Sequence, residues 1–140
     1  MGYEVYITRK TDWHDDDGPE IKLDEWCSLV NESADMRLDG YAEATTSSGE
    51  VLRIDKEGLS VWTSYSKHEE NGNMAWFYYL GGNISVKNPD EEILKKMYLL
   101  SESLDAKLQG EEGEIYDKDG QSNWKELRYK ESTKKWWQFF

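Results

Sequence analysis

The side chains that could carry out metal chemistry cluster in one short segment. His14 is followed by Asp15, Asp16 and Asp17, and an imidazole with carboxylates can bind a divalent cation. Neighbouring residues of an extended loop point in different directions, however, and no second group of ligands has a recognisable spacing. We therefore expect a solvated acidic loop, with no metal and no cofactor.

Two other candidates for chemistry have simpler structural explanations. Cys27 lies at helical spacing from Leu23 and Val30, which favours a buried structural thiol over a nucleophile. The run from Asp117 to Gly120 resembles the start of a calcium loop, but its glycine comes too early for the full loop pattern. The sequence thus points to no particular catalytic mechanism, and whether the protein is an enzyme stays open.

Charge and composition narrow the classes of partner and compartment. The 140 residues include 29 acidic and 17 basic ones, for a net charge of −12, which opposes binding to the phosphate backbone of a nucleic acid. No apolar run approaches the roughly 18 residues of a membrane span, and no signal peptide is visible at the start. The single cysteine cannot form an internal disulfide. We expect a cytoplasmic protein.

The charge is unevenly distributed along the chain. Six basic residues against three acidic ones give residues 118–140 a net charge of +3, which leaves −15 for the first 117 residues. The sequence predicts an acidic α+β domain over residues 1–117 and a basic, aromatic C-terminal tail over residues 118–140. We expect this tail to dock on the domain, because four of its last five residues are aromatic.

Hydrophobic periodicity predicts how the domain is built. Apolar residues alternate or run together in strand-like segments, and they recur at helical spacing in two others. The predicted strands are 3–9, 41–46, 51–55, 59–65, 74–80, 84–86, 106–109 and 114–117, and the predicted helices are 22–31 and one from about Asn88, as N-cap, to about Ser103. Short turns join consecutive strands. The expected fold is α+β, a mostly antiparallel sheet of about five to seven strands with two helices packed on one face.

Aromatic residues on both faces of the predicted sheet leave two interpretations open. Trp62 falls on the face opposite Val61, while Trp76 and Tyr78 share a face opposite Phe77 and Tyr79. Loops and the tail could cover the second face. Alternatively, an exposed aromatic patch of this kind would bind another molecule.

Several segments resemble those of a family of small acidic bacterial proteins whose function is uncharacterised. They are Tyr3 to Arg9, Trp13, Asp17 to Ile21, Glu25 to Trp26, Met36 to Leu38, Gly82 to Ile84, Lys87 to Asp90 and Gln109 to Glu114. The resemblance covers residues 1 to about 117, and it implies no catalytic residues. In size, charge and α+β build, the chain is also similar to bacterial immunity proteins, which neutralise toxins by binding them.

Two hypotheses about function follow. The first is a non-enzymatic cytoplasmic binding protein, such as an immunity-type inhibitor of a basic toxin, because an acidic surface steers association with a basic one. Its expected protein-binding residues are Trp13, Asp15, Asp16, Asp17, Glu20, Trp62, Glu69, Glu70, Glu111 and Glu112, with Glu114 beside the last two. These acids could also serve solubility alone, and the oligomeric state is undetermined.

The alternative hypothesis is a small-ligand-binding or enzymatic module. Its cleft would be lined by Trp62, Trp76 or Tyr78. A pocket that contains His14 or His68 favours this hypothesis, whereas a flat acidic surface favours the first.

Overall fold

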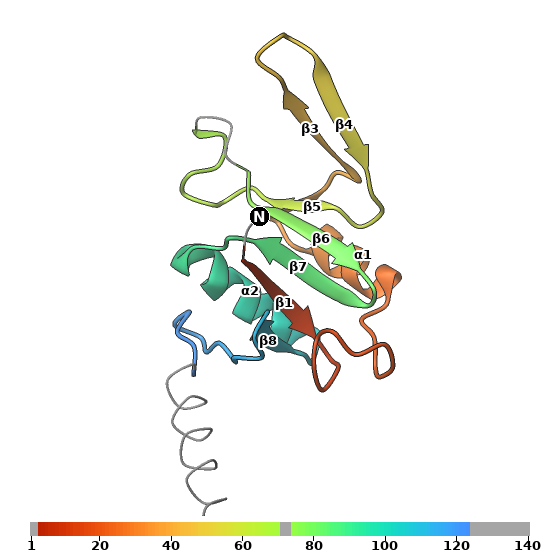
Figure 1. Cartoon of the computed structure of the whole chain (residues 1–140), viewed down its shortest axis with the longest axis vertical. Coiled ribbons are helices and arrows are strands. Elements are labelled where there is room, and N and C mark those ends of the chain that lie inside the picture. The colour runs from red at the N-terminus through yellow and green to blue at the C-terminus, as the bar shows by residue number, and fades with distance from the viewer. Residues whose placement is uncertain (1–2, 71–73, 124–140) are drawn as a thin grey trace, which may run out of the picture.

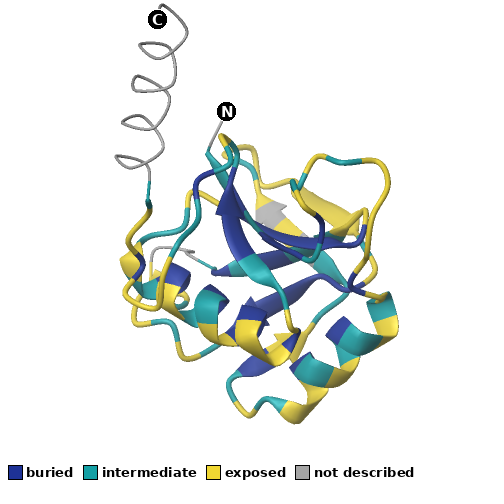
Figure 2. Ribbon diagram, turned by 90° about the horizontal axis from the view of Figure 1, so that it is seen from below, coloured by how far each residue is buried: buried dark blue, intermediate teal, exposed yellow. Residues whose placement is uncertain are grey.

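The described part of the chain forms a six-stranded antiparallel sheet with two helices, and a separate hairpin. The computed structural model describes residues 3–70 and 74–123. The elements are β1 (Glu4–Thr8), α1 (Leu23–Glu32), β2 (Met36–Leu38), β3 (Tyr41–Thr45), β4 (Val51–Asp55), β5 (Ser60–Trp62), β6 (Trp76–Leu80), β7 (Asn83–Lys87), α2 (Glu91–Ser103) and β8 (Lys107–Gly110). The strand order in the sheet is β2-β5-β6-β7-β1-β8. Both helices cover one face of this sheet (Figures 1 and 2), which confirms the predicted α+β class.

Alternation along the central strand β1 separates the two faces of the sheet. Val5 and Ile7 are buried in the core, under the helices, together with Trp26 of α1 and Met97 of α2. Residues next to them in sequence must point the other way because side chains of a strand alternate. Tyr6 therefore lies on the face directed away from α1 and α2.

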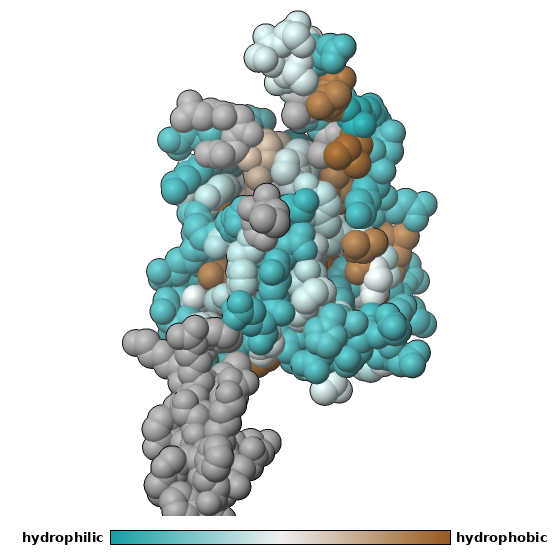
Figure 3. Space-filling view, in the orientation of Figure 1, coloured by the Kyte–Doolittle hydropathy of each residue, from teal (hydrophilic) through white to brown (hydrophobic). Residues whose placement is uncertain are grey.

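The hairpin β3–β4 stands apart from the main sheet, as Figure 1 shows. It was predicted from its turn residues, and its register pairs Tyr41 with Asp55 and Thr45 with Val51. Its side chains Val51, Leu52 and Ile54 are exposed. Figure 3 shows apolar side chains along this hairpin. An isolated two-stranded hairpin has little stability of its own in water, so this one gains from any contact with the sheet or with a bound molecule.

The start of α2 differs from the prediction by two residues. Asn88 has a φ of 48°, and its side-chain oxygen accepts a hydrogen bond from the backbone N–H of Tyr3 at 2.8 Å. Asp90 is the N-cap instead, and its carboxylate accepts the Ile93 N–H at 2.9 Å. The prediction was wrong here because Asn88 is used in a contact with the far end of the chain, which local sequence does not reveal.

The predicted division at residue 117 lies at the edge of what is described. Tyr116 pairs with Ser122 in an isolated bridge, and the Asn123 N–H donates to the carbonyl of Ile115 at 3.0 Å. Residues 118–123 therefore continue in contact with the domain. The rest of the predicted tail, 124–140, and its expected docking lie outside the described residues.

Arg9, the residue immediately after β1, connects this strand with α1 and with the end of α2. Its guanidinium forms a bidentate ion pair with Glu25 in the first turn of α1, at 2.9 and 2.7 Å. Its Nε donates to the carbonyl of Leu104 at the end of α2, at 2.8 Å. The hydrogen bonds from Arg9 and from the Lys22 N–H lower the pKa of Glu25 from 4.5 to about 2.

We expect Glu25→Gln to remove a pH-dependent part of the stability. A depressed folded-state pKa stabilises the fold above the unfolded-state pKa, and this contribution is lost as the pH falls through the folded-state value. The difference in unfolding free energy between wild type and variant should thus be constant above about pH 5.5 and shrink toward about pH 2. Urea unfolding followed by circular dichroism measures it. Glu50→Gln, at an exposed turn carboxylate, is the control, and the same pH dependence in that variant would contradict the assignment.

Candidate functional site

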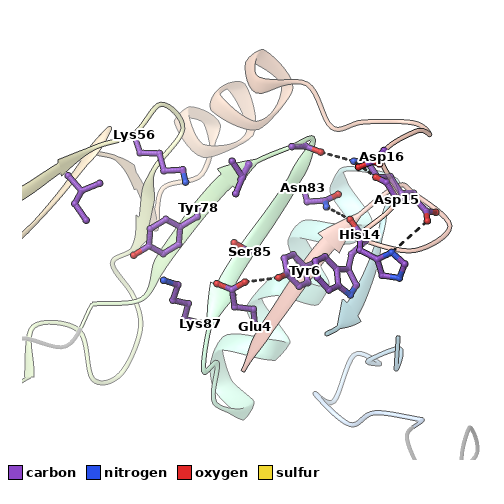
Figure 4. A pocket seen from close by; sticks show the side chains of 15 residues that line it. Glu4, Tyr6, His14, Asp15, Asp16, Lys56, Tyr78, Asn83, Ser85 and Lys87 are labelled. Atoms are coloured by element: carbon purple, nitrogen blue, oxygen red, sulfur yellow. Dashed lines mark hydrogen bonds and ion pairs between the residues drawn. The ribbon is translucent and has the colours of Figure 1, made fainter. Parts of the chain in front are cut away.

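The sheet face opposite the helices has a groove with a volume of about 510 Å³ (Figure 4). Three aromatic rings and several charged side chains line it. The lining residues are Glu4, Tyr6, Lys10, Trp13, His14, Asp15, Asp16, Ile54, Lys56, Tyr78, Leu80, Gly81, Asn83, Ser85 and Lys87. A volume in this range accommodates a small organic molecule.

Three structural units build the groove. Its floor consists of outward-facing residues of β1, β6 and β7, such as Tyr6, Tyr78 and Ser85. One wall is the loop after β1, and the other is the end of the hairpin, which contributes Ile54 and Lys56. The alternation that buries Val5 and Ile7 in the core thus also presents Tyr6 to the groove.

Trp13 folds back over the sheet and closes one side of the groove. Its ring stacks on Tyr6 with centroids 4.2 Å apart and planes 4° from parallel. Its indole N–H donates to the carbonyl of Glu111 at 3.0 Å, and its backbone N–H donates to the side chain of Gln109 at 2.8 Å. Hydrogen bonds hold both the side chain and the backbone of Trp13, so this wall of the groove is already formed before anything binds.

Lys10 anchors the same loop from beneath. The residue is buried, and its ammonium donates to the carbonyls of Asp15 at 3.0 Å and Gly81 at 2.8 Å. No carboxylate in the described ranges forms an ion pair with it. A buried ammonium group without a carboxylate partner needs other hydrogen-bond acceptors. The carbonyls of Asp15 and Gly81 are these acceptors, so their contacts with Lys10 hold the loop in its position.

Asn83 is the groove residue with an unsatisfied polar atom. It is 6% exposed, and its side-chain N–H donates to the carbonyl of Trp13 at 2.8 Å. Its Oδ1 has no hydrogen-bond partner among the described residues. A buried carbonyl oxygen of this kind normally accepts a hydrogen bond, and here the residue lies in the lining of the groove.

The positive and negative side chains of the groove lie mostly at opposite ends. Figure 4 shows Lys56 and Lys87 around Tyr78 at one end, and His14, Asp15 and Asp16 at the other. Glu4 accepts the Tyr6 hydroxyl at 2.6 Å, and burial with this hydrogen bond raises the pKa of Tyr6. Tyr6 therefore stays neutral and acts as a hydrogen-bonding and stacking residue, not as a base.

The structure brings together half of the predicted binding residues. Asp15 and Asp16 line the groove, and Trp13 contacts the turn that carries Glu111 and Glu112. We call these four acidic residues the acidic rim. The Glu111 carboxylate also accepts the backbone N–H of Glu4 at 2.7 Å, which ties this turn to the start of β1.

Other predicted binding residues lie elsewhere. Asp17 and Glu20 are exposed but outside the lining of the groove. Glu69 and Glu70 precede β6, and both β7 and β1 separate that strand from β8 and the turn after it. The predicted binding residues therefore do not form one surface.

Trp62 and Glu114 are buried and not available as surface contacts. Trp62 is 9% exposed, and its indole N–H donates to Asp35 at 3.0 Å, where it is part of the core. Glu114 accepts hydrogen bonds from the hydroxyls of Tyr3 and Tyr116. Alternation correctly put Trp62 opposite Val61, but which of the two faces the helices covered could not be read from that strand.

Sequence reasoning missed Lys10, Lys56, Asn83 and Lys87 as groove residues. Lysines at strand ends and an asparagine after two glycines have many possible roles. Nothing in the neighbouring sequence distinguishes these four residues from other polar residues of the surface. Tyr78 was found, because alternation put it on the face opposite Phe77. Trp76 lies outside the groove and lines a smaller hollow of about 300 Å³ with Arg37 and Glu69.

Comparison with models of known protein families, with curated proteins and with solved structures found no match to this chain. Within residues 3–70 and 74–123, no helix is long and apolar enough to cross a membrane. The same residues contain no group of three His, Cys, Asp or Glu side chains placed to hold a metal ion. The site is therefore judged on its own geometry.

We expect Lys10→Met to loosen the groove wall. Loss of the two charged hydrogen bonds should lower the free energy of unfolding by about 1–3 kcal/mol. Amide hydrogen exchange of residues 11–16 should speed up more than that of the core strands. Lys95→Met, in an exposed ion pair with Glu91 on α2, is the matched control and should change stability by less than about 1 kcal/mol. Equal effects of the two substitutions would refute the anchoring role of Lys10.

Proposed function

We propose that this protein is a non-enzymatic bacterial binding protein of the cytoplasm whose binding site for a small molecule is the groove. The observation that carries the proposal is an aromatic-lined groove that contains His14 and whose wall is already fixed by the stack of Trp13 on Tyr6. The buried Oδ1 of Asn83, beside the groove, could be satisfied by an ordered water.

The lining offers the combination of contacts that small-molecule sites use. Tyr6, Trp13 and Tyr78 provide flat apolar surface, and the charged residues at the two ends can orient a ligand. The stacked and hydrogen-bonded Trp13 keeps one wall in place, so little ordering is needed on binding.

We expect small aromatic probes to bind in the groove and Trp13→Ala to weaken them about tenfold, because the substitution removes a stacking surface worth over 1 kcal/mol. The probes are indole, indole-3-acetate and tryptamine, which differ mainly in charge. Titration followed by ¹H–¹⁵N NMR should shift the amides of Tyr6, Tyr78 and Ser85 together and saturably.

Trp76→Ala is the matched control for this experiment. Trp76 is also a half-buried tryptophan, on β6, but it lies outside the groove. Its substitution should leave probe binding unchanged, while core amides such as those of Val5 and Met97 report that both variants are folded. If none of the three probes shifts the groove amides, the proposed function is wrong.

The acidic rim supports a second candidate, a protein-binding function. Asp15, Asp16, Glu111 and Glu112 lie around the anchored Trp13, an arrangement in which an aromatic residue is bordered by charges. A basic protein would be steered to such a surface. Together with the resemblance in build to immunity proteins, this supports an inhibitor of a basic toxin as the protein-binding role.

We expect a rim variant, D15N/D16N/E111Q/E112Q, to lose a basic protein partner that the wild type retains from extracts of the native host at low salt. Raised salt should release the partner from wild type, because exposed charges are screened. The matched control is D24N/E32Q/E50Q/E57Q, which removes the same charge from exposed or half-exposed positions away from the rim. Equal recovery of the partner by both variants, after identification and reconstitution with purified protein, would rule out the rim as its binding surface.

A further inference from the structure

We infer that the end of the groove around Tyr78 binds the negatively charged group of an organic anion with an apolar body. This inference rests on the proposed function of the groove and specifies its ligand class. It follows from two lysines, one tyrosine and two exposed aliphatic side chains, each described below.

Lys56 and Lys87 come from different parts of the fold and converge on one ring. Lys56 follows the hairpin strand β4, and Lys87 ends β7. Their ammonium nitrogens lie 5.9 and 5.7 Å from the centre of the Tyr78 ring (Figure 4). These distances are at the outer limit of about 6 Å for a cation–π contact, so the ring holds each ammonium group only weakly.

These lysines are unpaired in a strongly acidic protein. Neither forms an ion pair with a carboxylate in the described part of the chain, although the protein carries a net charge of −12. Glu4 is the cross-strand neighbour of Lys87, but its carboxylate accepts the Tyr6 hydroxyl instead. Two cations near the same ring repel each other, and a bound anion would relieve that repulsion.

The apolar body of the ligand has a surface to contact beside the lysines. Ile54 and Leu80 line the groove, yet they are 63% and 64% exposed. A ligand that covers them gains roughly 25 cal/mol for each Å² of apolar area removed from water. An inorganic anion cannot make this contact, which is why the inferred ligand is organic.

The opposite end of the groove fixes the orientation of such a ligand. Asp15 and Asp16 lie there, and the nearest imidazole nitrogen of His14 is 3.9 Å from the Asp15 carboxylate. The Lys10 ammonium at that end already donates to two backbone carbonyls, so Asp15 and Asp16 repel a negative group there, whereas the lysine end attracts it. The ligand therefore places its anionic group toward Tyr78 and its remaining part toward Trp13.

The test compares indole-3-acetate with neutral indole on wild type and on K56M/K87M. We expect indole-3-acetate to bind wild type at least about tenfold more tightly than indole does, because its carboxylate can accept charged hydrogen bonds that indole cannot. In K56M/K87M this preference should be lost, so that indole-3-acetate binds the variant no more tightly than indole does. The NMR shifts of Tyr78 and Ser85 and the fitted dissociation constants are the readouts.

K67M/K95M is the control variant. It removes the same two positive charges from exposed lysines on the loop after β5 and on α2, outside the groove. It should keep the preference for the anion, which separates a local effect from a change in net charge. Raised ionic strength should weaken indole-3-acetate but not indole.

The outcomes distinguish failure of the anion site from failure of the proposed function. A preference that survives in K56M/K87M, or one lost equally in K67M/K95M, overturns the assignment of the anion site. Equal affinity of indole and indole-3-acetate for wild type also overturns it, while the proposed function of the groove stands. If neither probe shifts the groove amides, the proposed function fails, and the inference that rests on it fails as well.

Discussion

The helices α1 and α2 pack against the same face of the sheet, and this constraint determines what the other face can present. Burial of Val5 and Ile7 beneath the helices turns Tyr6 outward. Within residues 3–70 and 74–123, the outward face is bordered by the loop after β1 and by the end of the hairpin β3–β4. The space between these two covers is the groove, so the candidate site follows from the layer architecture itself.

The covering loop is held by polar contacts more than by apolar burial. Lys10 binds two backbone carbonyls, and Asn83 and Gln109 bind the backbone of Trp13. Hydrogen bonds of this kind fix geometry while contributing modest net stability. Apolar side chains packed beneath the loop would have filled the space beside it, whereas these hydrogen bonds hold the loop in place and leave a hollow there. The unsatisfied Oδ1 of Asn83 is consistent with a wall organised around a further polar contact.

Much of the fold was predictable because it depends on local periodicity. The alternation in β1, the helical spacing in α1 and the turn residues of the hairpin β3–β4 each determine their element with little help from the rest of the chain. The site was predicted only in part. Asp15 and Asp16 were found by their charge, but the stack of Trp13 on Tyr6 depends on hydrogen bonds to Gln109 and Glu111, nearly a hundred residues away. Trp62 shows the same limit, because its burial depends on which face the helices cover.

The groove and the acidic rim share Trp13, and this makes the two proposed binding functions interdependent. The inner face of the loop lines the groove, and the Glu111 turn that accepts the indole N–H carries half of the rim. A protein seated on the rim would restrict the same loop that a ligand contacts from within. If binding at one position changes the affinity at the other, linkage requires the reverse effect to have the same factor. If both functions exist, a ligand can be anchored at the lysine end of the groove, around Tyr78, without using this loop for its main contacts. The rest of such a ligand would still contact the loop, and in this way it could regulate a partner bound at the rim.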